Sequence, residues 1–280
     1  MSVGRRIVVR MRSKWQACGG GAAVGTLGGL IGLGGAEFRL PMLVGWFGYG
    51  VRVAVPLNLL ISLVTVAAAL LGRMLVLDPG ALATHAIEIV AIGAGSIVAA
   101  WIGAGWLAGM PEHLLERVVA LTLLAIAVVL IAEGGLPATT MWELGDELAV
   151  RVAAGMAAGV VIGIVSGLLG VAGGELIIPV LVLLFAVDIK TAGTASLIIS
   201  LPTVAVGLVR HWRRGAFADR APLRAVAAPM ALGSIVGANL GAALAWLAPA
   251  GALKLTLGVV LAVSALGLYR RARTPPARQL

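Results

Sequence analysis

The amino-acid sequence predicts an all-α polytopic membrane protein that consists of two tandem homologous halves. Composition is the first observation: 60% of the 280 residues are hydrophobic and only 12% are charged, whereas soluble domains carry about 25% charged residues. The apolar runs are the second, because the stretches 86–107 and 114–132 approach the length of about 20 residues that crosses a bilayer as a helix. These runs are continuous and do not alternate with polar residues, which argues against a β-barrel.

A glycine-rich motif that occurs twice is the third observation, and it indicates a duplication. The first copy, Gly28–Pro41, reads GGLIGLGGAEFRLP, and the second, Ser166–Pro179, reads SGLLGVAGGELIIP. The copies are 138 positions apart, and the same offset aligns Leu59–Ala67 with Leu197–Ala205 without a gap. A hydrophobic helix that is interrupted at corresponding places in both halves of a chain is the best sequence indication of a transporter's binding site.

The duplication divides the chain into four parts. Residues 1–132 form the first membrane repeat with a basic N-terminal arm, 133–148 a linker, 149–270 the second membrane repeat, and 271–280 a basic disordered tail. Predicted helices cover about 15–33, 39–49, 53–72, 84–108 and 113–132 in the first half, and about 149–170, 176–187, 190–210, 222–246 and 252–270 in the second. The second segment of each half, with about 12 residues, reaches only about half-way across the hydrocarbon core. Each half therefore has about four full transmembrane helices and one short half-spanning helix.

Basic residues predict which helix ends face the cytoplasm. The N-terminal arm, the stretch Arg210–Arg224 and the C-terminal tail are rich in Arg, while the linker 133–148 contains no Lys or Arg. Loops rich in Lys and Arg stay on the cytoplasmic side, so we expect a multi-pass protein of the cell inner membrane with both termini inside. Five crossings per half make the halves inverted repeats; four crossings make them parallel, and we favour inversion. The same rule accounts for the net charge of +9 without a nucleic-acid partner.

The two glycine-rich breaks are the predicted anion site. Glycine lets the backbone leave the helical conformation, and the helix after each break directs the positive end of its dipole into the membrane. Two such ends that face each other can bind a small anion, near Gly34 and Gly35 in the first copy and near Gly173 and Gly174 in the second. The alternative is that these glycines only allow close helix packing. We favour the anion site because the motif is repeated and carries adjacent charges.

Acidic and basic residues follow the breaks. Glu37 and Glu175 occupy equivalent places, and a carboxylate at membrane depth can relay protons or can cap the short helix by accepting from its free N–H groups. Arg39 has no charged counterpart in the second half; it either attracts the anion or pairs with Glu37. Arg52 and Lys190 are equivalent and can steer an anion, although snorkelling to the interface is the more ordinary role.

A stripe of polar residues in the third segment of each half completes the predicted site. Asn58, Ser62 and Thr65 in the first half correspond to Ser196, Ser200 and Thr203 in the second. Spacings of four and three residues place each set on one face of a helix, where it can hydrogen-bond an oxyanion or a neighbouring helix. We favour the oxyanion, since each stripe follows directly after a break.

No feature of the sequence indicates an enzyme. The His residues are isolated, the single Cys18 excludes a cysteine metal site, and neither a phosphate loop nor a nucleophile motif is present. We therefore expect no metal, no cofactor and no catalytic residue. The predicted partners are the lipid bilayer and a small anionic substrate; the oligomeric state stays open, with a homodimer as one alternative.

The doubled motif resembles that of the sulfite exporter TauE/SafE family. The resemblance rests on both glycine-rich copies, on the segments Ala54–Leu59 and Ala192–Leu197 that follow them, and on the two-half layout. It implies a transporter of small sulfur-containing anions such as sulfite or organosulfonates, often an exporter, driven by ion gradients. The first copy departs from the usual form at Ala36, where a third glycine is common, and at Pro56 and Asn58, which replace a Thr/Ser pattern.

These expectations combine into one functional hypothesis. The protein is a secondary transporter of a small oxyanion that works by alternating access between its halves, with Glu37 or Glu175 coupling the anion to protons. Two alternatives stay open: a passive anion channel, and a membrane accessory or scaffold protein without transport.

Overall fold

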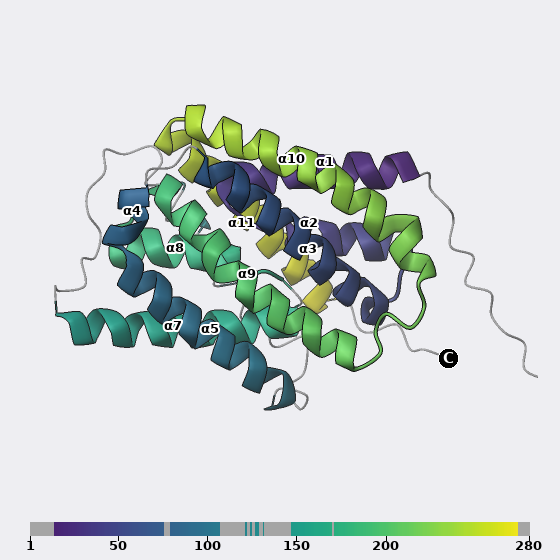
Figure 1. Ribbon diagram of the computed structural model, residues 1–280, viewed down its shortest axis with the longest axis horizontal. Coiled ribbons are helices and arrows are strands. Elements are labelled where there is room, and N and C mark those ends of the chain that lie inside the picture. The colour runs from purple at the N-terminus through teal and green to yellow at the C-terminus, as the bar shows by residue number, and fades with distance from the viewer. Residues whose placement is uncertain are drawn as a thin grey trace, which may run out of the picture.

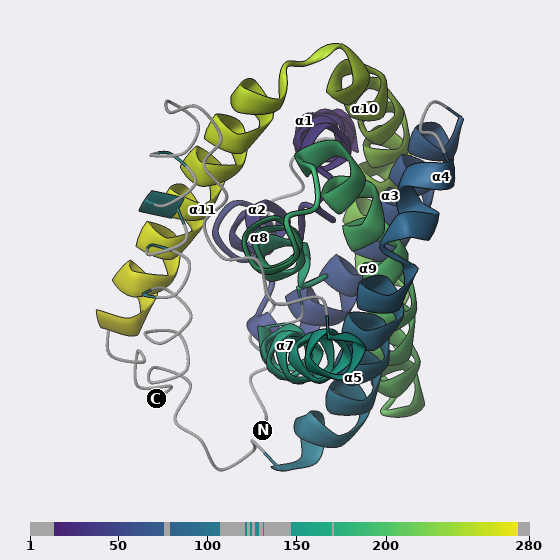
Figure 2. The same ribbon diagram turned by 90° about the vertical axis from the view of Figure 1, so that its left-hand side faces the viewer.

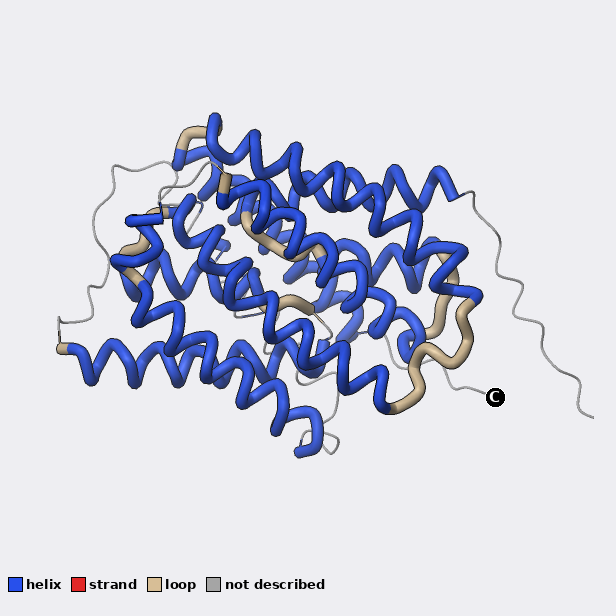
Figure 3. Tube along the Cα trace, viewed as in Figure 1, coloured by secondary structure: helices blue, strands red, loops and turns tan. Residues whose placement is uncertain are grey.

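The computed structural model describes residues 14–75, 79–106, 147–169 and 171–273, together with five residues between 121 and 131. Every regular element in these ranges is a helix (Figure 3). The first half contains α1 (Lys14–Ile31), α2 (Ala36–Pro41), the π-helix η1 (Met42–Trp46), α3 (Val51–Met74), α4 (Pro79–Thr84) and α5 (Ala86–Trp106). The second half contains α7 (Leu148–Leu169), α8 (Gly174–Phe185), α9 (Ile189–Arg213), the π-helix η3 (Leu223–Ala227), α10 (Ala228–Leu247) and α11 (Ala250–Arg273) (Figure 1).

Four helical stretches in the described part of the chain are long and apolar enough to cross a bilayer. They are Val53–Met74, Leu148–Ser166, Ile189–Arg213 and Leu223–Leu247. A helix of about 20 apolar residues satisfies all its backbone groups internally, which is what the hydrocarbon interior requires. The prediction of an all-helical, multi-pass membrane protein is thereby confirmed.

Most helix boundaries agree with the predicted segments to within about three residues, but the predicted helix 39–49 is observed as α2 followed by the π-helix η1. The fourth segment of the first half, expected as one helix over 84–108, is divided at His85 into the short α4 and the longer α5. The last helix, α11, continues to Arg273, three residues beyond the predicted boundary. The segment 113–132 and the linker 133–148 lie almost wholly outside the described residues, so the number of helices in each half stays a prediction.

Two pairs of long helices make the most extensive contacts in the bundle, and each pair joins one half to the other. α1 packs parallel to α10, and α5 packs parallel to α7, through glycines that lie directly against the partner's backbone. Gly21 faces the carbonyl of Met230, and Gly159 faces that of Ile92. Gly159 follows Gly21 by 138 positions and Met230 follows Ile92 by 138, so one contact is made twice with the halves exchanged. Small residues of this kind let membrane helices approach closely.

The central helices α3 and α9 pack against each other and run antiparallel. Gly207, late in α9, lies against Leu59, early in α3, whereas Arg73 at the end of α3 hydrogen-bonds to Thr194 near the start of α9. The sequence aligns these two helices at the offset of 138. These two equivalent helices therefore point in opposite directions.

The short helices α2 and α8 occupy the centre of the bundle. Figure 2 shows them end on and overlapping, while Figure 1 separates them along the long axis, so one lies behind the other. After the first break the chain turns back, because Leu43 and Phe47 pack in one cluster with Ala17 from the beginning of α1. The segments α1, α2 and η1 therefore form a helical hairpin that starts and finishes at the same end of the bundle.

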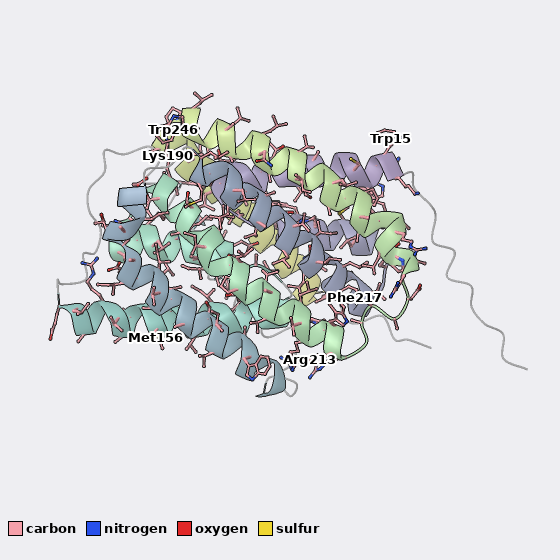
Figure 4. All side chains as sticks on the ribbon, viewed as in Figure 1. Trp15, Met156, Lys190, Arg213, Phe217 and Trp246 are labelled. Carbon is pink, nitrogen blue, oxygen red and sulfur yellow. The ribbon has the colours of Figure 1, made fainter. Side chains whose placement is uncertain are left out.

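The two ends of the bundle differ in their charged and aromatic residues (Figure 4). Trp15 lies at one end together with Arg213 and Phe217, which belong to the basic stretch 210–224. At the opposite end Lys190 Nζ donates to the Trp246 carbonyl oxygen at 2.9 Å and lies 5.4 Å from the centre of the indole ring. Tryptophans at both ends are typical of the two interfaces of a membrane protein.

Candidate anion-binding site

The two glycine-rich breaks meet inside the bundle. A Cβ built on Gly34 would lie 2.7 Å from the Cβ of Ala172, and one built on Gly174 would lie 3.4 Å from the Cα of Leu33. Leu33 and Gly34 belong to the first break, while Ala172 and Gly174 belong to the second. Two segments that are 138 positions apart in the sequence are thus in direct contact, and a Cβ at Gly34 would push them apart.

A left-handed glycine starts the short helix after each break. Gly35 precedes α2 with φ of 66°, and Gly173 precedes α8 with φ of 77°, a region that residues with a Cβ rarely adopt. Neither of these two capping positions has a side-chain hydrogen bond. Because the first N–H groups of a helix have no acceptor within the helix, the start of each short helix is electropositive.

Arg39 holds the first break and is fully buried. Its guanidinium donates to the backbone carbonyls of Gly34 and Gly35, the second from Nε at 3.2 Å. It also donates to the hydroxyls of Ser62 at 3.2 Å and Thr65 at 2.7 Å on α3. A buried charge persists only where its polar atoms are hydrogen-bonded, and these four acceptors meet that need. Arg39 therefore joins the first break to the polar stripe of its own half.

The remaining groups of the first-half stripe also bond to protein. The side-chain amide of Asn58 donates to the carbonyl of Ala36 at 3.0 Å, which ties α3 to the start of α2. The Thr65 hydroxyl donates to the carbonyl of Ile61 at 2.7 Å while it accepts from Arg39. All three predicted members of this stripe are thus engaged with neighbouring protein groups.

The second-half stripe on α9 is bonded differently. Ser196 and Ser200 are 0% and 1% exposed, and neither hydroxyl has a hydrogen-bond partner within the part of the chain that the structure describes. Thr203, in contrast, donates to the backbone one turn earlier at 2.9 Å and lies 3.4 Å from the hydroxyl of Ser96 on α5. A Cβ built on Gly174 would lie 3.0 Å from Ser196 Oγ. One hydroxyl without a partner therefore adjoins the start of α8.

The two glutamates occupy the first turns of the short helices. Glu175 lies in the first turn of α8 and is 7% exposed. Glu37 lies in the first turn of α2, and its side chain is outside the described residues. The described carboxylate is therefore buried beside an electropositive helix start, a place where a charge change has a large electrostatic effect.

Comparison with protein families shows what kind of molecule carries this arrangement. The model of the sulfite exporter TauE/SafE family matches residues 3–130 and 155–279. The chain belongs to the TauE/SafE family. No curated protein and no solved structure matches it. Membership confirms the resemblance inferred from the doubled motif and implies a membrane transporter of sulfur-containing anions.

Two of the predicted site residues of this TauE/SafE protein stand at the beginnings of long helices. Lys190 is at the end of the bundle, where its ammonium group bonds to the last turn of α10 at Trp246. That contact is typical of a lysine that reaches the membrane interface. Arg52 lies in the first turn of α3, and its side chain is outside the described residues. The buried hydroxyl of Ser196, and not Lys190, adjoins the second break.

Arg73 is a buried cation of this TauE/SafE chain that no motif in the sequence marks as a site residue. It is 5% exposed, and it donates to the carbonyls of Gly29 at 3.1 Å and Leu30 at 2.8 Å, at the end of α1. It also donates to the carbonyl of Lys190 at 3.1 Å and to the hydroxyl of Thr194 at 3.3 Å, both on α9. An arginine at the end of an apolar run is typical of the interface, so no sequence signal indicates its burial.

Proposed function

We propose that the protein is a secondary transporter that exports small sulfur-containing oxyanions such as sulfite or organosulfonates. One observation carries the proposal: the two breaks meet inside a bundle of apolar helices, and the buried hydroxyl of Ser196 adjoins the start of α8 there. Helix starts and hydroxyl donors bind oxyanions where water is excluded. The TauE/SafE family supplies the class of substrate.

The halves act as inverted repeats in this proposal. Support comes from the antiparallel course of α3 and α9, and from the α1–α10 contact that recurs between α7 and α5 with the halves exchanged. Inverted repeats around a central site can adopt two related conformations, each open to one side of the membrane. Alternating access follows from that relation.

Proton coupling through Glu175, or through Glu37 at the equivalent place, is part of the proposal. A charged carboxylate near the start of α8 repels an incoming anion, and the repulsion is strong in a medium of low dielectric constant. Protonation removes it. Binding of the proton and binding of the anion therefore favour each other, which is the thermodynamic requirement for moving both together.

The basic end of the bundle faces the cytoplasm in this proposal. Arg213 lies at that end with Trp15 (Figure 4), and the other basic residues of 210–224 are in the same stretch. Lys and Arg in short loops remain on the cytoplasmic side. Export would then carry the anion from this end toward the end where Lys190 contacts Trp246.

Transport of radiolabelled sulfite by the purified protein in liposomes tests the proposal. We expect uptake that saturates with sulfite, that speeds up when unlabelled sulfite is present on the opposite side, and that responds to an imposed pH gradient. A passive channel would saturate poorly and show no acceleration by the opposite pool. Liposomes with the protein that are no more permeable to sulfite than empty ones would leave only the scaffold alternative.

Substitution of the two glutamates tests the coupling step separately. We expect Glu175→Gln to transport at a rate that varies little with pH, because the amide cannot gain or lose a proton. Glu37→Gln shows whether the equivalent position shares the role. Glu147→Gln is the matched control, since this exposed glutamate lies just before α7. A wild-type rate that is independent of pH would remove coupling and leave transport intact.

A further inference from the structure

We infer that the two halves divide the anion site between them: Ser196 and Ser200 of the second half hydrogen-bond the oxygens of one anion, while the first half contributes only the charge of Arg39. The inference rests on the proposed function and deepens it by naming the direct ligands and the number of anions. A duplicated motif with matched polar stripes would otherwise suggest two equal anion sites.

The first-half stripe is already occupied by protein groups. The hydroxyls of Ser62 and Thr65 accept hydrogen bonds from the guanidinium of Arg39. The side-chain amide of Asn58 donates to the carbonyl of Ala36. An anion that approached these residues would have to displace a buried charge-assisted network. The first half is therefore closed to a direct ligand at this position.

The second-half stripe repeats the serine and the threonine but has Ser196 in place of Asn58, and it lacks an arginine like Arg39. The offset of 138 places Ile177 at the position of Arg39. Ile177 is 1% exposed and packs in an apolar cluster with Leu33 and Leu176. No group on α8 replaces the guanidinium, and the hydroxyls of Ser196 and Ser200 are buried without a partner in the described part of the chain.

A buried hydroxyl without a hydrogen-bond partner destabilises the fold unless a ligand supplies the missing acceptor. A buried polar group without a hydrogen bond destabilises a fold, and other hydroxyls on the same helices avoid this by donating to the carbonyl one turn earlier, as Thr194 and Thr203 do. Ser196 and Ser200 do not. Their donors are thus available to an acceptor that the protein does not supply, and an oxyanion has several acceptor oxygens.

The start of α8 is a second reason to place the anion in the second half. α8 contains 12 residues, whereas α2 contains six and continues into a π-helix. The first N–H groups of α8 have no acceptor within the helix and form its electropositive end. Gly174 at that end adjoins Ser196 Oγ, and the backbone donors and the hydroxyl can therefore reach the same oxyanion.

Arg39 contributes its charge without contacting the anion. Its N–H groups point to the carbonyls of Gly34 and Gly35 and to the stripe on α3. Gly34 in turn lies against Ala172 of the second break. The guanidinium is thus one residue away from the second break, and Coulomb attraction acts over that distance in a dry interior.

A matched pair of variants tests the division, because the duplication supplies the control. In the purified full-length transporter, Ser200→Ala should raise the KM for sulfite about tenfold or more, since a hydrogen bond to a charged group is lost. Ser62→Ala removes the same atom at the equivalent position. It should lower the melting temperature through Arg39 and change the KM several-fold less. Thr256→Val on α11, which removes a hydroxyl bonded only to its own helix in the described structure, should leave the KM unchanged.

Two further measurements keep the inference falsifiable. Ser200→Thr keeps the hydroxyl and should restore most of the affinity, which distinguishes a lost ligand from a folding defect. Equilibrium dialysis of the wild type against radiolabelled sulfite should give about one anion per chain. Equal KM increases for Ser62→Ala and Ser200→Ala, or two anions per chain, would overturn the division while transport itself survives. A wild type that neither binds nor transports sulfite would instead refute the proposed function.

Discussion

The two glycine-rich breaks share a motif and a left-handed glycine, but the polar groups around them have different hydrogen-bond partners. At the first break, the guanidinium of Arg39 bonds to the carbonyls of the break and to the hydroxyls of α3. At the second, Ile177 stands in the place of Arg39, and the hydroxyls of Ser196 and Ser200 have no partner in the described structure. Two copies of one motif therefore differ in which of their polar groups are bonded to protein.

The comparison teaches how a duplicated membrane fold can become asymmetric. One helix contact recurs at the offset of 138, as Gly21 and Gly159 show. One charged residue in a single copy then determines which polar groups are satisfied internally. Substitutions in the two halves test that contrast.

The glycines of the breaks should show the largest difference. A Cβ at Gly32, which has φ of 96°, would overlap the backbone of Gly193 on α9. Gly173, with φ of 77°, has only side-chain neighbours, the nearest being Ile162 at 3.0 Å from a built Cβ. We expect Gly32→Ala to abolish a monodisperse peak in detergent size exclusion, and Gly173→Ala to cost about 1–2 kcal/mol for the left-handed conformation. Normal elution of both variants would show that the first break is not tightly packed.

Methionine at the two equivalent positions of the short helices should separate the halves next. Arg39→Met leaves two carbonyls and two hydroxyls without their donor, and we expect a loss of about 3–5 kcal/mol. Ile177→Met conserves volume in an apolar site, and we expect a loss below about 1.5 kcal/mol. Thermal unfolding in one detergent compares them. Similar melting temperatures would mean that Arg39 does not hold the first break.

The ends of α3 and α9 offer a third pair, at Arg73 and His211, which are equivalent at the offset of 138. Arg73→Met removes the donors to Gly29, Leu30 and the start of α9, and we expect a loss of about 2–4 kcal/mol. His211→Ala, at the half-buried end of α9, should change stability by about 0.5 kcal/mol or less. Hydrogen exchange at the end of α1 should rise in the arginine variant alone. Exchange that is unchanged there would contradict the role of Arg73.

The threonines of the stripes should give the smallest contrast. Thr65→Val removes an acceptor of Arg39 at 2.7 Å, and we expect a loss of about 1–3 kcal/mol because a charged donor is left short of a partner. Thr203→Val removes a bond to its own helix and a 3.4 Å contact with Ser96, and we expect a loss of about 1 kcal/mol or less. Chemical or thermal unfolding of the two variants side by side is the measurement. A larger loss for Thr203→Val would reverse the proposed asymmetry.

The sequence predicted the helices well because the signals are local. Continuous apolar runs place segments such as 53–72 and 190–210 in the membrane, and α3 and α9 lie there within a few residues. The doubled motif indicated the family, which the match over most of the chain confirmed. Fold class and family could thus be predicted from local sequence patterns.

The sequence could not predict the partners of the buried polar residues. Arg39 was expected to attract the anion or to pair with Glu37, and its described donors reach Gly34, Gly35 and the stripe on α3. Lys190 and Arg73 look alike as cations at helix ends, yet one lies against Trp246 and the other is buried. Such differences depend on groups that come together only after the helices pack.

By itself, the sequence determined that this chain is a helical membrane protein with a repeated interruption, because the free energy of placing a segment in lipid depends mainly on the residues of that segment. Only the tertiary structure decided which copy of the interruption has its polar groups satisfied. Hydrogen bonds require donor and acceptor atoms within about 3 Å, and those at Arg39, Ser62 and Gly34 belong to three different segments that meet only in the folded bundle.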